Sequence, residues 1–176
     1  GISQNSGVAK NTIKKYITYL EAAFLIKVIH RIDQNGKKFK RANFFKIYLT
    51  NPSLRSALFS PITVDDEFIG NMVETAIFAQ WQHSQDASLY YARWNSGEVD
   101  MVSLNSKQKP NWCIEIKWSN RFANKPNELK NVKLFCGKHN LNAVMVTTVD
   151  IEKTVNHDGV EYDFLPASQY CYSVGK

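Results

Sequence analysis

The sequence has few cysteines and no long apolar run. Its three cysteines, Cys113, Cys136 and Cys171, are odd in number and far apart in the chain. This pattern favours a reducing cytoplasm over a disulfide framework. No Cys or His residues have the spacing of a zinc site, and no apolar segment reaches the roughly 20 residues that cross a bilayer. We therefore expect a cytoplasmic protein that has no disulfides and does not enter the membrane.

The sequence also lacks a nucleotide-binding loop, and its first third has few acidic residues. No G-x-x-x-x-G-K-[ST] stretch is present, so we expect neither ATPase activity nor a bound nucleotide. Residues 1–60 carry 11 Lys and Arg but only Glu21 and Asp33 as acids, a net charge of +9, whereas residues 61–176 carry −3. A basic first third predicts a polyanionic partner, nucleic acid first, with a merely solvated surface as the alternative.

The first third also has a recognisable order of elements. Apolar residues at helical spacing predict a helix over residues 12–24, and residues 6–12 resemble a tight turn between two helices. Two strands should follow, over residues 24–30 and 46–50, with a turn at Asn35-Gly36 in the polar segment between them. Helix, turn, helix and hairpin is the order of a winged helix. The break "SPITVDD" then predicts a boundary between a winged-helix domain, residues 1–62, and a second domain, residues 63–176.

Basic side chains on this predicted helix and hairpin are the candidates for phosphate contacts with nucleic acid, DNA in the first place. They are Lys14, Lys15, Arg31, Lys37, Lys38, Lys40, Arg41 and Lys46. Winged helices also serve protein contacts, so a protein partner stays open.

The second part of the chain predicts an α/β fold. A helix over about residues 66–82 is apolar around much of its circumference, yet it carries Glu74 among Gly70, Ile77, Phe78 and Trp81. Three strands should follow, at residues 88–94, 98–104 and 111–118, then a helix from Pro126, a strand over 142–149, a short strand and a last helix near Pro166. This order implies a mixed sheet covered on both faces.

Charged residues inside two of these strands point to chemistry. Strand alternation places Cys113, Glu115 and Lys117 on one face of "WCIEIKW" and the apolar core residues on the other. Asp100 on the neighbouring strand can approach Glu115. Two adjacent carboxylates repel each other unless a cation lies between them, and Mg²⁺ prefers oxygen ligands. Lys117 could then orient a water, help to deprotonate it or stabilise charge on a phosphate.

Asp100 followed by Glu115-x-Lys117 on the next strand resembles the signature of the PD-(D/E)XK nucleases. The resemblance implies a restriction-endonuclease-like domain in which Asp100, Glu115 and the Ile116 carbonyl bind Mg²⁺, Lys117 serves the attacking water, and Glu74 holds the metal or its waters. Glu98-Val99-Asp100 stands where the family often has a Pro-Asp pair.

A narrower resemblance covers nearly the whole chain. The segments "GVAKNTIKKYITYLEAAFLI", "KIYLTNPSLRSAL", "GNMVETAIFAQW", "YYARWNSGEVDMV" and "IEIKWS" occur in this order. They resemble the C-terminal half of a group of prokaryotic AAA-type ATPases, with a winged helix followed by a nuclease-like domain. By this resemblance the chain begins inside the winged helix, and its partners include an ATPase domain of the same protein. A homo-oligomer is left open.

Structural readings of the same residues stay open as well. Glu115 and Lys117 could form a plain ion pair, and Glu74 could form a salt bridge with Lys117 or Arg93. Two functions therefore remain: a metal-dependent nuclease, and a non-catalytic module that binds nucleic acid or protein and regulates an ATPase.

Overall fold

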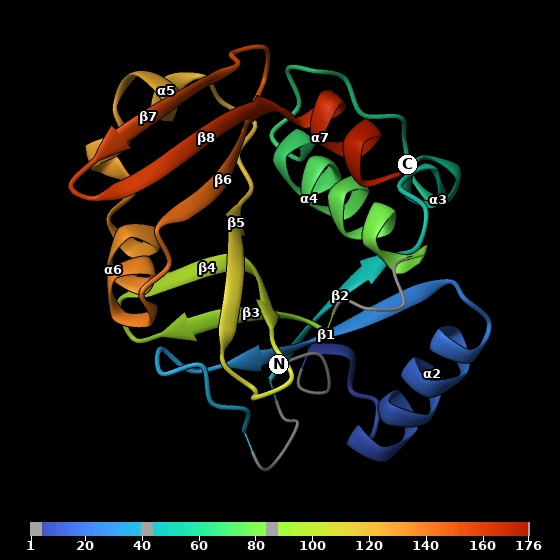
Figure 1. The fold of residues 1–176 in the computed structure, drawn as a ribbon. Coiled ribbons are helices and arrows are strands. Elements are labelled where there is room, and N and C mark those ends of the chain that lie inside the picture. The colour runs from blue at the N-terminus through green and yellow to red at the C-terminus, as the bar shows by residue number, and fades with distance from the viewer. Residues whose placement is uncertain (1–4, 40–43, 84–87, 176) are drawn as a thin grey trace.

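The fold is a mixed α/β structure, shown in Figure 1. The computed structural model describes residues 5–39, 44–83 and 88–175, without the side chain of His83. The helices of these ranges are α2 (Lys10–Ala22), α3 (Ser53–Leu58), α4 (Ile69–Gln80), α5 (Arg121–Asn124), α6 (Lys130–His139) and α7 (Ala167–Val174), with 3₁₀ turns at Trp81–His83 and Pro126–Glu128. The strands are β1 (Ile26–Ile32), β2 (Phe45–Leu49), β3 (Leu89–Trp94), β4 (Gly97–Leu104), β5 (Pro110–Glu115), β6 (Ala143–Thr148), β7 (Lys153–His157) and β8 (Val160–Pro166).

All eight strands belong to one sheet, in the order β2-β1-β3-β4-β5-β6-β8-β7. The pairs β1–β3, β5–β6 and β6–β8 are parallel, and the other neighbours are antiparallel. The mixed sheet that the sequence predicts is therefore present.

Helices pack on both faces of this sheet, so the central strands are buried on both sides. On one face α6 contributes Phe135 to a core that also contains Cys113 of β5. On the other face α4 and α7, which lie side by side in Figure 1, pack Ile77 and Tyr170 against Ile114. The predicted alternation along β5 is confirmed, because Ile114 and Ile116 lie in the second core, with Trp112 and Trp118 packed against it, and Cys113 lies in the first.

Several predicted element bounds shift by a few residues. Helix α2 ends at Ala22 rather than Phe24, because Phe24 adopts a left-handed conformation with φ of 56° that a helix cannot continue. Helix α4 begins at Ile69 rather than near Asp66, whose carboxylate instead accepts a hydrogen bond from the Phe68 N–H at 2.9 Å. Strand β7 and helix α5 were not predicted from the sequence.

The β1–β2 hairpin is part of the main sheet. Strand β1 pairs in parallel with β3, and Ile32 at its end is fully buried in the core beside Ala92 and Val99. The loop after β1 packs against the start of β5, where a Cβ on Gly36 would lie 2.7 Å from Pro110. His139 Nε2 of α6 donates to the Gln34 carbonyl of this loop at 2.9 Å. The sheet therefore runs across the predicted division at residues 62 and 63, and a separate winged-helix domain stays a prediction.

Candidate functional site

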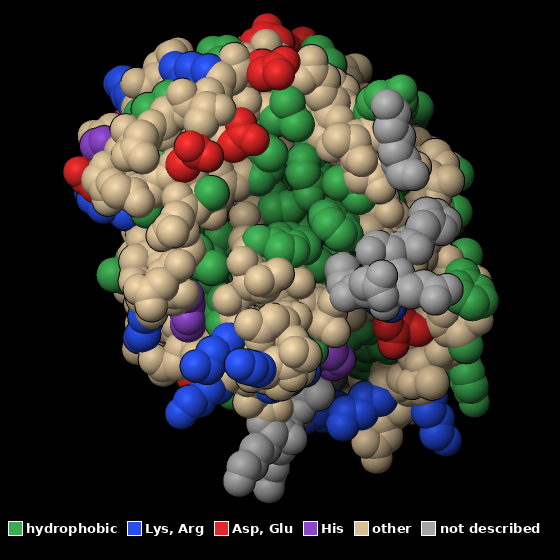
Figure 2. All heavy atoms as spheres, in the orientation of Figure 1, with side chains coloured by type: hydrophobic (Ala, Val, Ile, Leu, Met, Phe, Trp, Pro, Cys, Tyr) green, Lys and Arg blue, Asp and Glu red, His purple; other side chains and the backbone are tan. Residues whose placement is uncertain are grey.

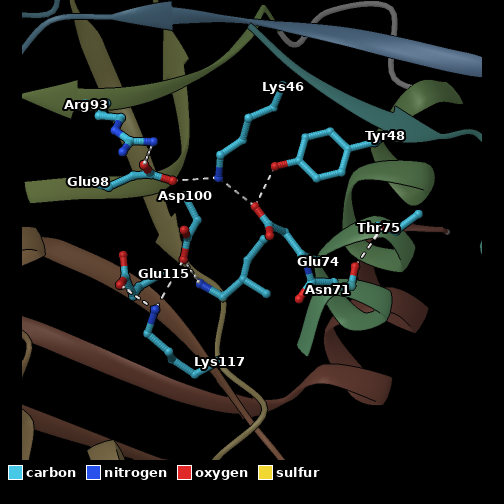
Figure 3. Close-up of polar contacts among 11 residues, drawn as sticks. Lys46, Tyr48, Asn71, Glu74, Thr75, Arg93, Glu98, Asp100, Glu115 and Lys117 are labelled. Atoms are coloured by element: carbon cyan, nitrogen blue, oxygen red, sulfur yellow. Dashed lines mark hydrogen bonds and ion pairs between the residues drawn. The ribbon is translucent and has the colours of Figure 1, made fainter. Parts of the chain in front are cut away.

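The predicted triad of Asp100, Glu115 and Lys117 gathers where β4 and β5 separate. Met101 pairs with Ile114 in the antiparallel ladder, which sets Asp100 and Glu115 opposite each other at the next position. Lys117 Nζ lies 2.8 Å from Glu115 Oε1 and 3.5 Å from Asp100 Oδ2 (Figure 3). The prediction that the two carboxylates share one face of the sheet is confirmed.

The backbone on either side of Glu115 is held by side chains from other strands. Asp100 Oδ2 accepts a hydrogen bond from the Ile116 N–H at 2.9 Å. Thr147 of β6, which is fully buried, is joined to Lys117 twice: its hydroxyl accepts from the Lys117 N–H and donates to the Lys117 carbonyl, both at 2.8 Å. These bonds fix the direction in which Lys117 leaves the strand.

Glu115 is in an unusual electrostatic position. Burial, followed by the charge of Asp100, raises the pKa of Glu115 to about 7, although Lys117 acts against this. Burial lowers the pKa of Lys117, but Asp100 and Glu115 more than offset this effect and hold it above its ordinary value. Glu115 Oε2 is buried and has no hydrogen-bond partner. A buried carboxylate oxygen without a partner is costly, so the site can accept a further donor or a cation there.

A second charged group lies beside the first and is centred on Lys46 of β2. Its Nζ lies 2.9 Å from Glu74 Oε1 and 2.6 Å from Glu98 Oε1, as Figure 3 shows. The Tyr48 hydroxyl donates to the same Glu74 oxygen at 2.5 Å, and Arg93 Nη1 lies 3.3 Å from Glu98 Oε2. Glu74 is therefore ion-paired, but its partner is Lys46, and the suggested pairing with Lys117 or Arg93 is wrong.

Burial lowers the pKa of Lys46, but Glu74 and Glu98 more than offset this and raise it above its ordinary value. Burial and the charge of Glu74 raise the pKa of Tyr48. Lys46 therefore remains an ammonium ion, and Tyr48 remains a neutral hydrogen-bond donor, throughout the neutral pH range.

The three predicted carboxylate ligands and Glu98 thus form two neighbouring pairs of carboxylates, each bridged by a lysine. Asp100 and Glu115 share Lys117, and Glu74 shares Lys46 with Glu98. Among the residues that the structure describes, no group of three His, Cys, Asp or Glu side chains is arranged to hold a metal ion as it stands. The role of Ile116 as a carbonyl ligand stays a prediction.

The predicted phosphate-binding residues are spread over several environments. Lys14, Lys15, Lys37 and Lys38 are exposed, whereas Lys46 is committed to the two glutamates. Arg31 donates from Nε to the Arg93 carbonyl at 3.0 Å, and its guanidinium lies 4.8 Å from the Phe39 ring and 5.0 Å from the Phe44 ring. Lys40 and Arg41 lie outside the described residues.

The surface view agrees with the uneven charge of the sequence. In Figure 2, Lys and Arg side chains gather along the lower edge of the molecule, below the sheet in the orientation of Figure 1, and several Asp and Glu side chains lie in the upper part. Other Lys and Arg side chains lie at the upper left of the same view, so the basic residues are not confined to one edge, whereas the ammonium groups of Lys46 and Lys117 lie among the carboxylates of the site.

Three residues of the site, Glu98, Tyr48 and Thr147, were not predicted from the sequence. Glu98 lies two positions before Asp100, so strand alternation alone could have placed it on the same face. No sequence pattern around Tyr48 or Thr147 predicts that they belong to the site, because their contacts with Glu74 and Lys117 depend on how strands that are distant in sequence come together.

Comparisons with known proteins add one match. The model of a domain of unknown function, DUF8612, matches residues 1–65, which is less than half of the chain. Neither the curated proteins nor the solved structures gave a match. Among the described residues, no helix is both long and apolar enough to cross a membrane.

Proposed function

We propose that this chain is a nuclease-like, divalent-metal-dependent phosphodiesterase that acts on nucleic acid, DNA in the first place. The observation that carries the proposal is the geometry at the end of β5. Asp100 and Glu115, on neighbouring strands, both form ion pairs with Lys117, and the buried Oε2 of Glu115 has no hydrogen-bond partner. A group of this kind is more costly to build than an exposed ion pair, and it suits a site that receives a cation.

The residues fit a magnesium site of the type expected from the sequence. Asp100 and Glu115 would supply carboxylate oxygens and the Ile116 carbonyl a third oxygen, and oxygen atoms are the ligands that Mg²⁺ prefers. The cation would supply Lewis-acid stabilisation of charge on the phosphate. Lys117 lies beside both carboxylates, where its ammonium can orient a water and stabilise negative charge that develops on the phosphate oxygens.

The resemblance to the C-terminal half of AAA-type ATPases supports a wider setting for this activity. In this setting, helix α2 and the β1–β2 hairpin belong to a winged helix that binds nucleic acid, and the nuclease-like domain follows it. The protein also contains an ATPase domain and works in the cytoplasm. The exposed basic residues Lys14, Lys15, Lys37 and Lys38 support this docking role.

A second function is a non-catalytic binding module, and one observation favours it. Each of the four carboxylates at the site already has a lysine partner. In that case the charges serve only to join β2, β4, β5 and α4.

Cleavage of supercoiled and single-stranded DNA separates the two functions. We expect the parent protein to cut when Mg²⁺ or Mn²⁺ is added, and Glu115→Gln and Lys117→Ala to lose at least about 100-fold in rate. Glu152→Gln and Lys107→Ala remove the same charges at exposed positions and should cut like the parent. A parent protein that cuts neither substrate, or a Glu115→Gln variant that cuts at the parent rate, would favour the binding module.

A further inference from the structure

Lys46 occupies a place in the acidic site that resembles the place of Lys117. Its Nζ lies between Glu74 and Glu98, at 2.9 and 2.6 Å, as the Nζ of Lys117 lies between Asp100 and Glu115. The four carboxylates converge from β4, β5 and α4 in Figure 3. Lys46 extends from β2 and contacts two of them, Glu74 and Glu98. One of the two lysines therefore comes from the part of the chain that matches the domain of unknown function.

Other residues hold both glutamates in place independently of Lys46. Tyr48 is buried, stacks on Phe78 of α4 with ring centroids 4.1 Å apart, and directs its hydroxyl at Glu74. Arg93 contacts the other oxygen of Glu98 at 3.3 Å. The two carboxylates would thus stay near each other if the ammonium were removed, and carboxylates in this position repel unless a proton or a cation joins them.

We infer that Lys46 is a positioning residue of the metal site: it holds Glu74 and Glu98 on its own ammonium, so that the site takes one divalent cation, on Asp100 and Glu115, and not two. This inference rests on the proposed function. According to this inference, Glu74 forms an ion pair with Lys46 and is not a ligand of the cation. The inference also makes the hairpin part of the site, because without β2 Glu74 and Glu98 lose the ammonium that lies between them, and only Arg93, on the far oxygen of Glu98, remains as a counter-charge.

The number of Mn²⁺ ions bound per chain tests the inference. Calorimetric titration with Mn²⁺ alone should give one ion for the parent and two for Lys46→Met, which keeps the aliphatic chain but removes the charge. Lys46→Arg should restore a single ion, because it returns the positive charge. A structural role of Lys46 would change stability without changing the count. An unchanged count and affinity in Lys46→Met would overturn the inference.

A second variant covers the case in which Lys46→Met does not fold. Glu74→Gln keeps the shape of the side chain and leaves Lys46 paired with Glu98. It should bind Mn²⁺ within about twofold of the parent affinity. A loss of tenfold or more would make Glu74 a ligand and would overturn the inference.

The result for the parent protein separates this inference from the proposed function. A parent that binds no Mn²⁺ would contradict the proposed site on Asp100 and Glu115. If Lys46→Met then binds one ion, and the double variant Lys46→Met/Glu74→Gln binds none, the role of Lys46 still stands. If Lys46→Met also binds none, both fail.

Discussion

At the scale of single residues, Glu115 decides how the site behaves. Its side chain is nearly buried, one oxygen contacts Lys117 at 2.8 Å and the other has no partner. Burial outweighs the ion pair, so the pKa of Glu115 rises rather than falls. A single lysine therefore does not satisfy this carboxylate, and the remaining demand for positive charge is what a cation would meet.

The raised pKa of Glu115 predicts how stability depends on pH. The folded state holds the proton up to about pH 7, whereas the unfolded chain releases it near the ordinary value of 4.5. The contribution of Glu115 to the free energy of unfolding is therefore full below pH 4.5 and is lost as pH rises through 7. Each pKa unit is worth about 1.4 kcal/mol, so the change is roughly 3 kcal/mol.

Urea denaturation of the parent and Glu115→Gln between pH 4.5 and 8 measures this effect. The difference in the free energy of unfolding between the two should change in favour of Glu115→Gln as pH rises, while Glu152→Gln should follow the parent. A constant difference over the whole range would mean that the pKa of Glu115 is not raised.

At the scale of elements, the site joins parts of the chain that are far apart in sequence. The strand β4 brings Asp100 and Glu98, β5 brings Glu115, and β2 brings Lys46. The loop between β1 and β2 is held on the body of the protein at Gly36. There the backbone has φ of 73°, and Pro110 leaves no room for a side chain.

Gly36→Ala should loosen this loop. The variant incurs both the cost of a left-handed alanine, about 1–2 kcal/mol, and a clash with Pro110. Gly7→Ala is the matched control, because Gly7 has φ of 67° but no atom within 4 Å of an added Cβ. Thermal unfolding should show a larger loss of stability for Gly36→Ala. Equal losses would show that Pro110 moves away at little cost.

The exposed lysines of the same loop predict the salt dependence of nucleic-acid binding. If Lys37 and Lys38 contact phosphates, replacing both with Ala should reduce the slope of log K against log salt by roughly two, since each contact contributes about one. Lys125→Ala/Lys153→Ala removes as many charges elsewhere and should leave the slope unchanged. Equal slopes for the loop variant and the parent would favour a protein-contact role for the hairpin.

Sequence patterns predicted most of these elements. They succeeded where a contact joins neighbouring strands, and they failed where a contact depends on the path of a distant strand. The alternation in "WCIEIKW" was sufficient to predict the faces of β5 and the approach of Asp100 to Glu115, because both depend on neighbouring strands. The position of Lys46 could not be predicted, since a charged residue in a basic hairpin suggests a phosphate contact. Only the path of β2 shows that Lys46 reaches Glu74 and Glu98.

At the scale of the whole molecule, one sheet joins the two parts of the chain on either side of the predicted boundary at residues 62 and 63. The hairpin pairs with β3, and Ile32 lies in the same core as Phe135 of α6. A continuous sheet and a shared core favour one cooperative unfolding transition.

This predicts that β1 unfolds together with the rest of the sheet. The four tryptophans, Trp81, Trp94, Trp112 and Trp118, all lie after residue 65, so their fluorescence follows the unfolding of the second part of the chain and of the cores that it shares with β1. Hydrogen exchange of the β1 amides in urea should follow the same midpoint as this fluorescence. Loss of β1 protection at clearly lower urea would instead indicate a separate N-terminal unit with its boundary near residue 62.

The central claim is that Asp100 and Glu115 form a divalent-cation site, and the change in melting temperature on addition of Mg²⁺ tests it most directly. At about 100 times its Kd, a cation that binds only the folded state adds about 2.7 kcal/mol, which raises Tm by roughly 5–10 °C for a chain of this length. We expect this increase for the parent and for Lys117→Ala, and a much smaller one for Glu115→Gln, at constant ionic strength. If Mg²⁺ leaves Tm of the parent unchanged, or raises Tm of Glu115→Gln equally, Asp100 and Glu115 do not form the site.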